Sequence, residues 1–315
     1  VILAYHDAAH EIVQYPDPKC TRLIHDLANV ERLPASFFLC GNGAADLIFR
    51  LCYAKKPKRT LLLSPTFSEY ERALTAARSP IDFFPLMREQ NFSVTAEILP
   101  LIKGHDLLIF CNPNNPTGQI TEKNLMKQIL LECEKNDCLF VVDECFMDFV
   151  ETENASMKDQ LETSSHLLIL KAFTKIFAIP GLRLGYCISK NRALLTQMEL
   201  SGQSWSVSVP AEVCGIAALS EEKFSAKTRQ FVRQQRKKLR DGLKAFGFTV
   251  YDSHTNYLLF YTDLLDLDSK LAENGFLIRN CENFRGLESG FYRIAIRTES
   301  ENTALLDALQ KILNA

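Results

Sequence analysis

The chain has 315 residues, of which 47% are hydrophobic and 23% charged, and its formal net charge is −2. These proportions are typical of a globular protein, and the small net charge does not indicate binding to nucleic acid or to an anionic membrane. Because no apolar run approaches the ~20 residues of a membrane-spanning helix, we predict neither a membrane nor a nucleic-acid partner.

The ten cysteines are scattered along the chain, with no C-x-x-C pair and no accompanying cluster of histidines. We therefore predict no metal site. Five of them lie in apolar runs and are predicted to be small core residues: Cys52, Cys111, Cys138, Cys145 and Cys187. Unpaired core cysteines and the lack of a visible signal peptide predict a cytoplasmic protein. Because the sequence opens on Val1 rather than Met, we expect further residues to precede it.

The first part of the chain predicts helices separated by turns. A short helix is expected to end at the two prolines of Tyr15–Pro18. A second helix follows over about Thr21–Val30, and Gly41–Gly43 then forms a tight turn that opens an amphipathic helical pattern.

Apolar runs and helical segments then alternate. The runs are TLLLS, DFFPL, DLLIFC, CLFVVDE, LLILK and LRLGYCIS, and the helices lie near Glu69–Ala77, Thr95–Lys103 and Thr121–Asn136. Unbroken apolar strands alternating with helices predict a largely parallel sheet that is covered on both faces. Ligands of such sheets bind at the carboxyl ends of the strands, so we expect the functional residues directly after the apolar runs.

From about Asn191 the pattern changes to long helices. The charges of the basic helix Arg229–Phe246 indicate a solvated face, because apolar residues recur at near-helical spacing; nucleic-acid binding is the less favoured alternative, since no aromatic residues are interleaved. The strands TVY, NYLLFY, FLIR and YRIAIR alternate with helices at the end of the chain and predict a smaller α+β domain.

We place the large domain at 19–200, and the small domain with its connecting helices at 1–18 and 201–315.

Lys175 is the first functional candidate and follows the predicted strand LLIL within the stretch KAFTKIFAIPGLRLGY. A lysine held at a strand end is costly to desolvate, and this cost frees its amine to act as a nucleophile. The alternative is a surface lysine on a loop. Lys171, in the same stretch, is expected to be an ordinary lysine at the end of the strand.

Other candidates follow neighbouring strands. Asn115 lies in the loop CNPNNPTG, whose prolines keep the Asn115 amide in a fixed position. The motif by itself predicts only a turn. Asp143 ends an apolar strand, where a carboxylate needs a partner; a helix cap or an ion pair is the alternative. The glycine turn in Gly41–Asp46 predicts either an anion site or a plain helix cap. Phe67 and Tyr70 of SPTFSEY are either a stacking platform or core.

Together these groups match what pyridoxal phosphate needs: an amine, a carboxylate for the pyridine nitrogen, a donor for the ring hydroxyl, a stacking face and an anion cradle. The motifs NPNNPTG, VDE and TKxxxxxGLRxGY resemble those of fold-type I pyridoxal-phosphate enzymes of the aminotransferase class I/II superfamily, over essentially the whole chain. The resemblance implies an α/β fold of the PLP-dependent transferase type, with a large, mostly parallel sheet covered by helices and a smaller α+β domain.

The resemblance also implies residue roles. Lys175 would form a Schiff base with the cofactor, and Asp143 would pair with its pyridine nitrogen. The other implied cofactor contacts are Asn115 at the ring hydroxyl, Phe67 on the ring face, Gly43, Ala44, Thr174 and Arg183 at the phosphate, and Tyr15 at the phosphate of the neighbouring subunit. The last contact implies a homodimer with a shared site.

Within the superfamily the chain resembles histidinol-phosphate aminotransferases and the L-threonine-O-3-phosphate decarboxylases of cobalamin biosynthesis. Phe146 and stretches such as LIRNCENFRGLESGFYRIAIRTESEN are more similar to the decarboxylases. Arg293 matches the arginine that binds the substrate carboxylate, whereas Arg279 and Arg297 are either phosphate ligands or members of surface ion pairs. We expect decarboxylation of a phosphorylated amino acid. An aminotransferase and a non-catalytic regulatory protein that binds the cofactor are the alternatives.

Two features depart from the family pattern. Ala172 stands where both groups of relatives usually carry a hydroxyl, so one phosphate contact is expected to be lost, a change of ~1.5–3 kcal/mol. The family's N-terminal arm, with its His-Gly-Gly and Asn-Pro-Leu-Gly segments, has no counterpart in the sequence. Its substrate contacts are therefore not assigned.

Overall fold

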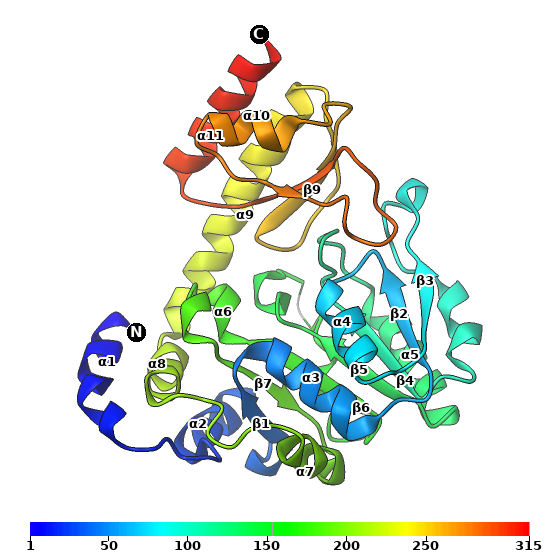
Figure 1. Ribbon diagram of the computed structural model, residues 1–315, viewed down its shortest axis with the longest axis vertical. Helices are drawn as coiled ribbons and strands as arrows, with labels where there is room; N and C mark the ends of the chain where they lie inside the picture. Colours follow the sequence, from blue (N-terminus) through cyan, green and yellow to red (C-terminus); the bar gives the residue numbers. More distant parts are fainter. Residues whose placement is uncertain (153, 315) are drawn as a thin grey trace.

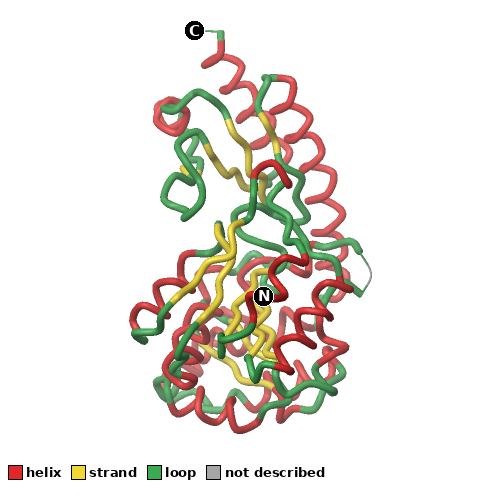
Figure 2. The backbone as a smooth tube through the Cα atoms, turned by 90° about the vertical axis from the view of Figure 1, so that its right-hand side faces the viewer, coloured by secondary structure: helices red, strands yellow, loops and turns green. Residues whose placement is uncertain are grey.

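The computed structural model describes residues 1–152 and 154–314, which form two β-sheets that lie one above the other (Figures 1 and 2). Within these residues the larger sheet has seven strands in the order β1-β7-β6-β5-β4-β2-β3, and the smaller has four in the order β10-β11-β9-β8. The larger sheet consists of β1 (Phe38–Gly41), β2 (Thr60–Ser64), β3 (Ile81–Pro85), β4 (Leu107–Cys111), β5 (Leu139–Asp143), β6 (Leu167–Ala172) and β7 (Gly185–Ile188).

Strands β2 to β6 of the larger sheet pair in parallel, which confirms the predicted α/β class. Strand β7 runs antiparallel to both β6 and β1, so one side of the sheet is mixed. The sequence does not predict β1, because its four residues are too few to show a period and lead directly into the glycine turn.

Helices cover both faces of the larger sheet. Successive strand residues point to opposite faces, so Leu62 of β2 packs among the residues of α3, α4 and α7, whereas Leu61 and Leu63 pack on the side of α2, α5 and α8. These helices are α2 (Thr21–Glu31), α3 (Gly43–Lys55), α4 (Ser68–Ala76), α5 (Lys123–Lys135), α7 (Arg192–Leu200) and α8 (Val209–Leu219).

The smaller sheet forms a second core with the helices of the C-terminal part. Its strands are β8 (Thr249–Val250), β9 (Tyr257–Tyr261), β10 (Arg279–Asn280) and β11 (Phe291–Ala295), and its helices are α9 (Glu222–Ala245), α10 (Leu267–Glu273) and α11 (Glu299–Leu313). Helix α9 runs from this core toward α8 and the larger sheet (Figure 1). Of the predicted strand FLIR, only Arg279 lies in a strand, and β10 continues from it to Asn280.

Short helices complete the fold. The predicted N-terminal helix is divided into α1 (Ile2–Asp7) and a 3-10 helix, and the helix predicted near Thr95–Lys103 is also of the 3-10 type because Pro100 lies within it. The remaining short elements are α6 (Phe173–Ile176), η1 (Ala8–Val13), η2 (Ala35–Phe37), η3 (Arg88–Gln90), η4 (Ala96–Ile102), η5 (Met147–Phe149), η6 (Met157–Gln160) and η7 (Pro180–Leu182).

Two further predictions concern burial and domain boundaries. The five cysteines predicted to lie in the core are buried. The division at residues 18 and 200 stays a prediction: Ala211 and Ala218 of α8 pack in the core of the larger sheet, so this helix connects the two parts. No helix in the described part of the chain is long and apolar enough to cross a bilayer.

Candidate active site

A cavity of about 350 Å³ lies where the carboxyl ends of the larger sheet face the smaller sheet. Its lining comes from both parts of the chain and consists of Phe67, Asn115, Phe146, Lys175, Asn256, Tyr257, Leu277, Arg279, Arg293 and Ala295. Five residues predicted from the sequence to be functional therefore meet in one cavity, although nearly 230 positions separate the first from the last.

Lys175 lies in α6, directly after β6, and is half-buried. Its Nζ atom is 5.1 Å from the centroid of the Phe146 ring, and both side chains line the cavity. The alternative of a surface lysine on a loop is therefore wrong. Thr174 is buried next to it in the first turn of the helix, and Ala172, just before the helix, provides no side-chain cap.

Asp143 ends β5 and is only 5% exposed. The phenol of Tyr70 donates a hydrogen bond to Oδ2 at 2.6 Å, and the backbone N–H of Cys145 donates to Oδ1 at 3.0 Å. Burial, together with the charge of Asp143, raises the pKa of Tyr70 well above its usual value, so the phenol remains a proton donor. Sequence reasoning placed Tyr70 at this edge but missed it as the partner of the carboxylate.

The glycine turn brings Arg183 to the start of α3. Gly43 has a φ of +79°, and a Cβ atom there would lie 2.5 Å from Nη2 of Arg183. On the neighbouring strand β7, a Cβ atom at Gly185 would lie 2.6 Å from the backbone nitrogen of Ala44. Glycine is therefore required at both positions, because the start of α3 lies too close to β7 and to the Arg183 guanidinium to leave room for a side chain. Backbone N–H groups and an arginine together form a cradle for an anion.

Asn115 and Arg293 join the two sheets inside the cavity. Asn115 is buried after β4, and its Oδ1 atom accepts a hydrogen bond from Nη1 of Arg293 on β11. The guanidinium of Arg293 also lies 5.0 Å from the centroid of the Tyr257 ring. Arg279 is the register partner of Arg293 across the β10–β11 pair, which places two arginines in one cavity.

Other predicted site residues lie at the edge of this cavity or outside it. Phe67 lines the cavity and contacts the Tyr70 ring edge-on, with 5.5 Å between the ring centroids. Arg297 does not line it: its Nη2 atom is 2.6 Å from Oε1 of Glu301, which is the surface ion pair that the sequence left open. Tyr15 is 83% exposed and lies against Trp205, away from the cavity of its own chain.

Asn256 and Tyr257 are cavity residues that sequence reasoning missed. The Oδ1 atom of Asn256 is buried and has no hydrogen-bond partner among the described residues. The Tyr257 hydroxyl donates to the carbonyl of Asn114 at 2.8 Å and so holds the loop that carries Asn115. A polar residue directly before the apolar strand of TNYLLF was the available signal.

Comparison with known proteins agrees with this arrangement. Residues 4–309 match the family model for aminotransferase class I and II. Over 306 residues the chain is 35% identical to a threonine-phosphate decarboxylase of Salmonella typhimurium, which covers 96% of this chain and 84% of that protein.

Solved structures with the same architecture include two enzymes. A histidinol-phosphate aminotransferase of Clostridium acetobutylicum has a TM-score of 0.93 at 27% identity, covering 99% of this chain and 94% of its own. An L-threonine-O-3-phosphate decarboxylase of Porphyromonas gingivalis has a TM-score of 0.86 and covers 100% of this chain and 95% of its own; at 23% identity this likeness concerns the fold.

Proposed function

The chain belongs to the aminotransferase class I and II family, and from this premise we propose that it decarboxylates a phosphorylated amino acid. Enzymes of this family depend on pyridoxal phosphate, and this is the cofactor of the chain. The proposed substrate is L-threonine O-3-phosphate, with (R)-1-amino-2-propanol O-2-phosphate and carbon dioxide as products. A place in cobalamin biosynthesis and a cytoplasmic location are part of the proposal.

The residues of the site fit the cofactor. The cradle at Gly43, Ala44 and Arg183, where a Cβ atom would collide with the guanidinium, supports binding of a phosphate group. The buried carboxylate of Asp143 supports binding of a protonated ring nitrogen, because both of its hydrogen-bond donors are neutral groups. Thr174 would add a hydroxyl at the phosphate, and Phe67 a ring face.

Each residue then has a separate task. When bound, pyridoxal phosphate supplies an electron sink for the bond that breaks next to the substrate nitrogen. Lys175 would hold the cofactor. After the carboxylate has left Cα, the same lysine would deliver the proton that replaces it there. Asp143 would hold the proton at the ring nitrogen, and Asn115 would donate from its amide nitrogen to the ring hydroxyl.

The pair of arginines in the cavity is the observation that supports a doubly anionic substrate. Arg293 and Arg279 face one another across β10 and β11, and both line the cavity that contains Lys175. Arg293 would bind the carboxylate with its planar fork, and Arg279 the phosphate. The cleaved bond must stand perpendicular to the cofactor ring, and two fixed anions determine that orientation.

Transamination of histidinol phosphate is the second candidate, because the aminotransferase of Clostridium acetobutylicum is similar over nearly the whole chain. That reaction would use Lys175 to remove the Cα proton instead. A non-catalytic role in regulation is less favoured, because Lys175, Asp143 and Asn115 are all present.

The distinguishing experiment follows carbon dioxide after the protein, loaded with pyridoxal phosphate, is mixed with L-threonine O-3-phosphate. We expect release by the wild type, whereas Lys175→Ala should show neither release nor the yellow colour of the bound cofactor. If no carbon dioxide is released and an amino group passes from histidinol phosphate to 2-oxoglutarate, the aminotransferase candidate replaces the decarboxylase.

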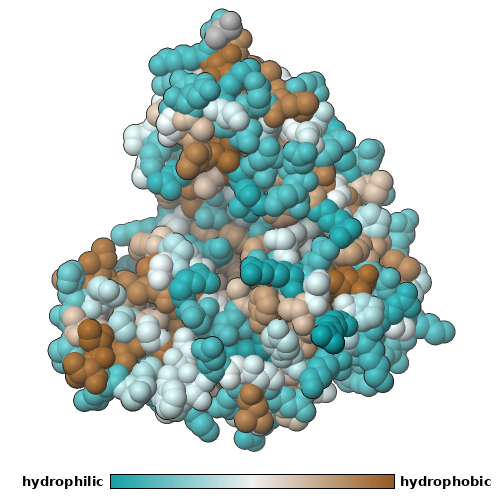
Figure 3. Space-filling model, in the orientation of Figure 1, coloured by the Kyte–Doolittle hydropathy of each residue, from teal (hydrophilic) through white to brown (hydrophobic). Residues whose placement is uncertain are grey.

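We also propose that two copies of the chain share the site. Apolar side chains are exposed around α1, on the left of Figure 3, and they include Ile2, Leu3, Ile12 and Val13. A second copy of the chain would cover this surface. Tyr15 lies at its end and is free to reach a neighbouring cavity.

A further inference from the structure

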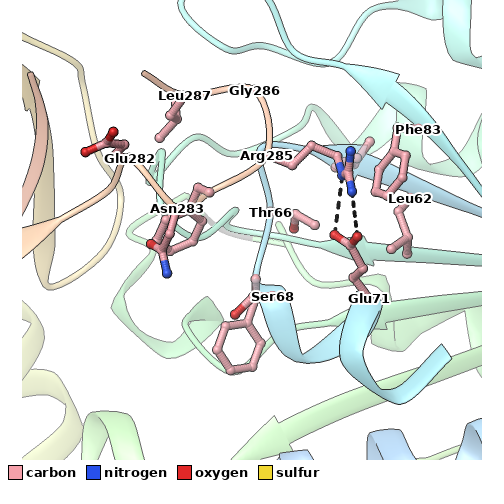
Figure 4. A pocket seen from close by; sticks show the side chains of 13 residues that line it. Leu62, Thr66, Ser68, Glu71, Phe83, Glu282, Asn283, Arg285, Gly286 and Leu287 are labelled. Carbon is pink, nitrogen blue, oxygen red and sulfur yellow. Dashed lines mark hydrogen bonds and ion pairs between the residues drawn. The ribbon is translucent and has the colours of Figure 1, made fainter. Parts of the chain in front are cut away.

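The loop of residues 281–290 leaves the smaller sheet between β10 and β11 and lies against the larger sheet (Figure 4). Arg285 of this loop forms a two-armed ion pair with Glu71 of α4, with 2.6 Å from Nη2 to Oε1 and 3.4 Å from Nε to Oε2. The hydroxyl of Ser64 donates to the carbonyl of Arg285 at 2.8 Å. The guanidinium also lies 4.3 Å from the centroid of the Phe83 ring. Arg285 therefore attaches the loop to β2, β3 and α4.

The same loop holds a side chain of the candidate active site. Oδ1 of Asn283 accepts a hydrogen bond from Nη2 of Arg279 at 2.9 Å. The guanidinium of Arg279 lies 5.7 Å from the centroid of the Phe284 ring. Since Arg279 also lines the cavity of Lys175, its position there depends on where the loop lies.

The loop does not fill the space beneath it. A cavity of about 510 Å³ separates it from β2 and α4 and is lined by Glu71, Asn283 and Arg285, among others (Figure 4). Phe67 lines both this cavity and the one that contains Lys175, so the two cavities adjoin. The outer part of the loop is held through Arg285, through the buried Phe284 ring, through Leu287, which packs against the core of the larger sheet, and through Glu288, whose Oε1 atom lies 3.7 Å from Nη1 of Arg88.

A role in folding does not explain this ion pair. The side chains of Arg285 and Glu71 are 55% and 38% exposed, and exposed ion pairs contribute little to stability. Two parallel contacts between a guanidinium and a carboxylate do restrict orientation, because the planar fork allows few arrangements. The geometry thus suits a contact that positions the loop.

We propose that Glu71 and Arg285 are positioning residues whose ion pair fixes the 281–290 loop and, through Asn283, holds Arg279 in place to bind the phosphate of the substrate. The identity of the phosphate ligand rests on the proposed function, whereas the docking of the loop does not. Loss of the ion pair weakens binding of the phosphate end of a ligand.

Glu71→Gln tests the proposal, with Glu69→Gln as its matched control, because Glu69 lies on the same helix and pairs only with Arg72 among the described residues. The probe is 1-amino-2-propanol O-2-phosphate, which carries a phosphate and no carboxylate, and calorimetry on the cofactor-loaded protein gives its Kd. We expect Glu71→Gln to raise Kd about tenfold and Glu69→Gln to change it less than about twofold. For threonine phosphate, KM should rise and kcat should fall, because the phosphate contact also helps to orient the cleaved bond. Exchange of the charges, Glu71→Arg with Arg285→Glu, should restore binding.

Limited digestion with trypsin provides a readout that needs no substrate. Trypsin cleaves after Arg285, and Glu71→Gln should speed this cleavage about tenfold relative to Glu69→Gln. Arg279→Gln should weaken binding of the probe without changing the cleavage rate. Equal Kd values and equal cleavage rates in the two glutamate variants would overturn the proposal. If the wild type does not bind the probe, the proposed function fails, and the cleavage rates alone decide whether Glu71 docks the loop.

Discussion

Asp143 illustrates how one buried carboxylate is kept ready for a ligand. Removing a charge from water is costly unless the charge is paired or hydrogen-bonded. The two donors to Asp143, the Tyr70 phenol and the Cys145 N–H, satisfy its oxygens without neutralising it. No ion pair involves Asp143 in the described part of the chain, so the charge remains available to a cationic group of the cofactor.

Tyr70→Phe should therefore destabilise the protein most when no cofactor is bound. The substitution removes one donor to a buried carboxylate, which costs about 1.5–3 kcal/mol of unfolding free energy. In the proposed role of Asp143, the ring nitrogen of bound pyridoxal phosphate would supply another donor to this carboxylate and reduce the loss. Urea unfolding with and without the cofactor measures the difference.

Tyr251→Phe is the matched control, because the Tyr251 hydroxyl is buried without a hydrogen-bond partner among the described residues. Its removal should cost little in either form. Equal losses in Tyr70→Phe with and without cofactor would show that Asp143 does not face the bound ring.

At the scale of elements, a buried charge network joins the end of α2 to β6 and β7. The Tyr186 hydroxyl donates to Oε1 of Glu31 at 2.7 Å, and Nζ of Lys158 lies 2.8 Å from Oε2. Nζ of Lys171 is 3.4 Å from Oε1 of Glu31 and 3.1 Å from Oδ1 of Asp148. The expectation that Lys171 is an ordinary strand-end lysine is wrong. Its side chain is only 13% exposed and forms ion pairs with carboxylates that two other elements contribute.

This network predicts a stability loss in acid. Burial alone raises the pKa of Glu31, but the charges of Lys171 and Lys158 outweigh burial and lower that pKa from 4.5 to about 2. The carboxylate therefore contributes stability that is complete above its usual pKa and is lost as the pH falls through about 2, with a contribution of up to about 3 kcal/mol.

Urea unfolding of the wild type and of Glu31→Gln over this acidic range measures the contribution. The free energy of unfolding should fall more steeply with decreasing pH in the wild type than in the variant. Glu69→Gln, which removes an exposed pair within α4, should follow the wild type. Parallel curves for all three proteins would contradict the assignment of the shift to Glu31.

For the whole molecule, the exposed apolar surface around α1 predicts self-association. Ile12→Asp combined with Val13→Asp places charges on this surface and should shift the protein from dimer to monomer in sedimentation velocity. The monomer should also bind pyridoxal phosphate more weakly, because Tyr15 then reaches no neighbouring site. Leu131→Asp, at an exposed apolar position on α5, is the control. A wild type that sediments as a monomer and retains full affinity for the cofactor would contradict the shared site.

Most of the large sheet could be predicted from the sequence because its signals are local. Apolar runs bounded by turn residues are typical of buried parallel strands, and they placed β2, β4, β5 and β6 within a residue or so of their observed bounds. The predictions that failed have physical reasons as well. Strand β1 is too short to show a period, and Pro100 converts an expected α-helix into a 3-10 helix.

The identity of the chemical groups at the strand ends follows from local sequence patterns; these groups include Lys175 after β6, Asp143 at the end of β5 and Asn115 after β4. Strand ends are local features, and parallel pairing brings them to one edge.

The pairing of these groups is a property of the folded molecule. It joined Arg293 to Asn115 across 178 positions, paired Tyr70 with Asp143, and paired Lys171 with Glu31 and Asp148. Such partners depend on how two sheets and their helices pack, because an ionisable group removed from water takes the partner that packing brings within reach, and no local pattern specifies that partner.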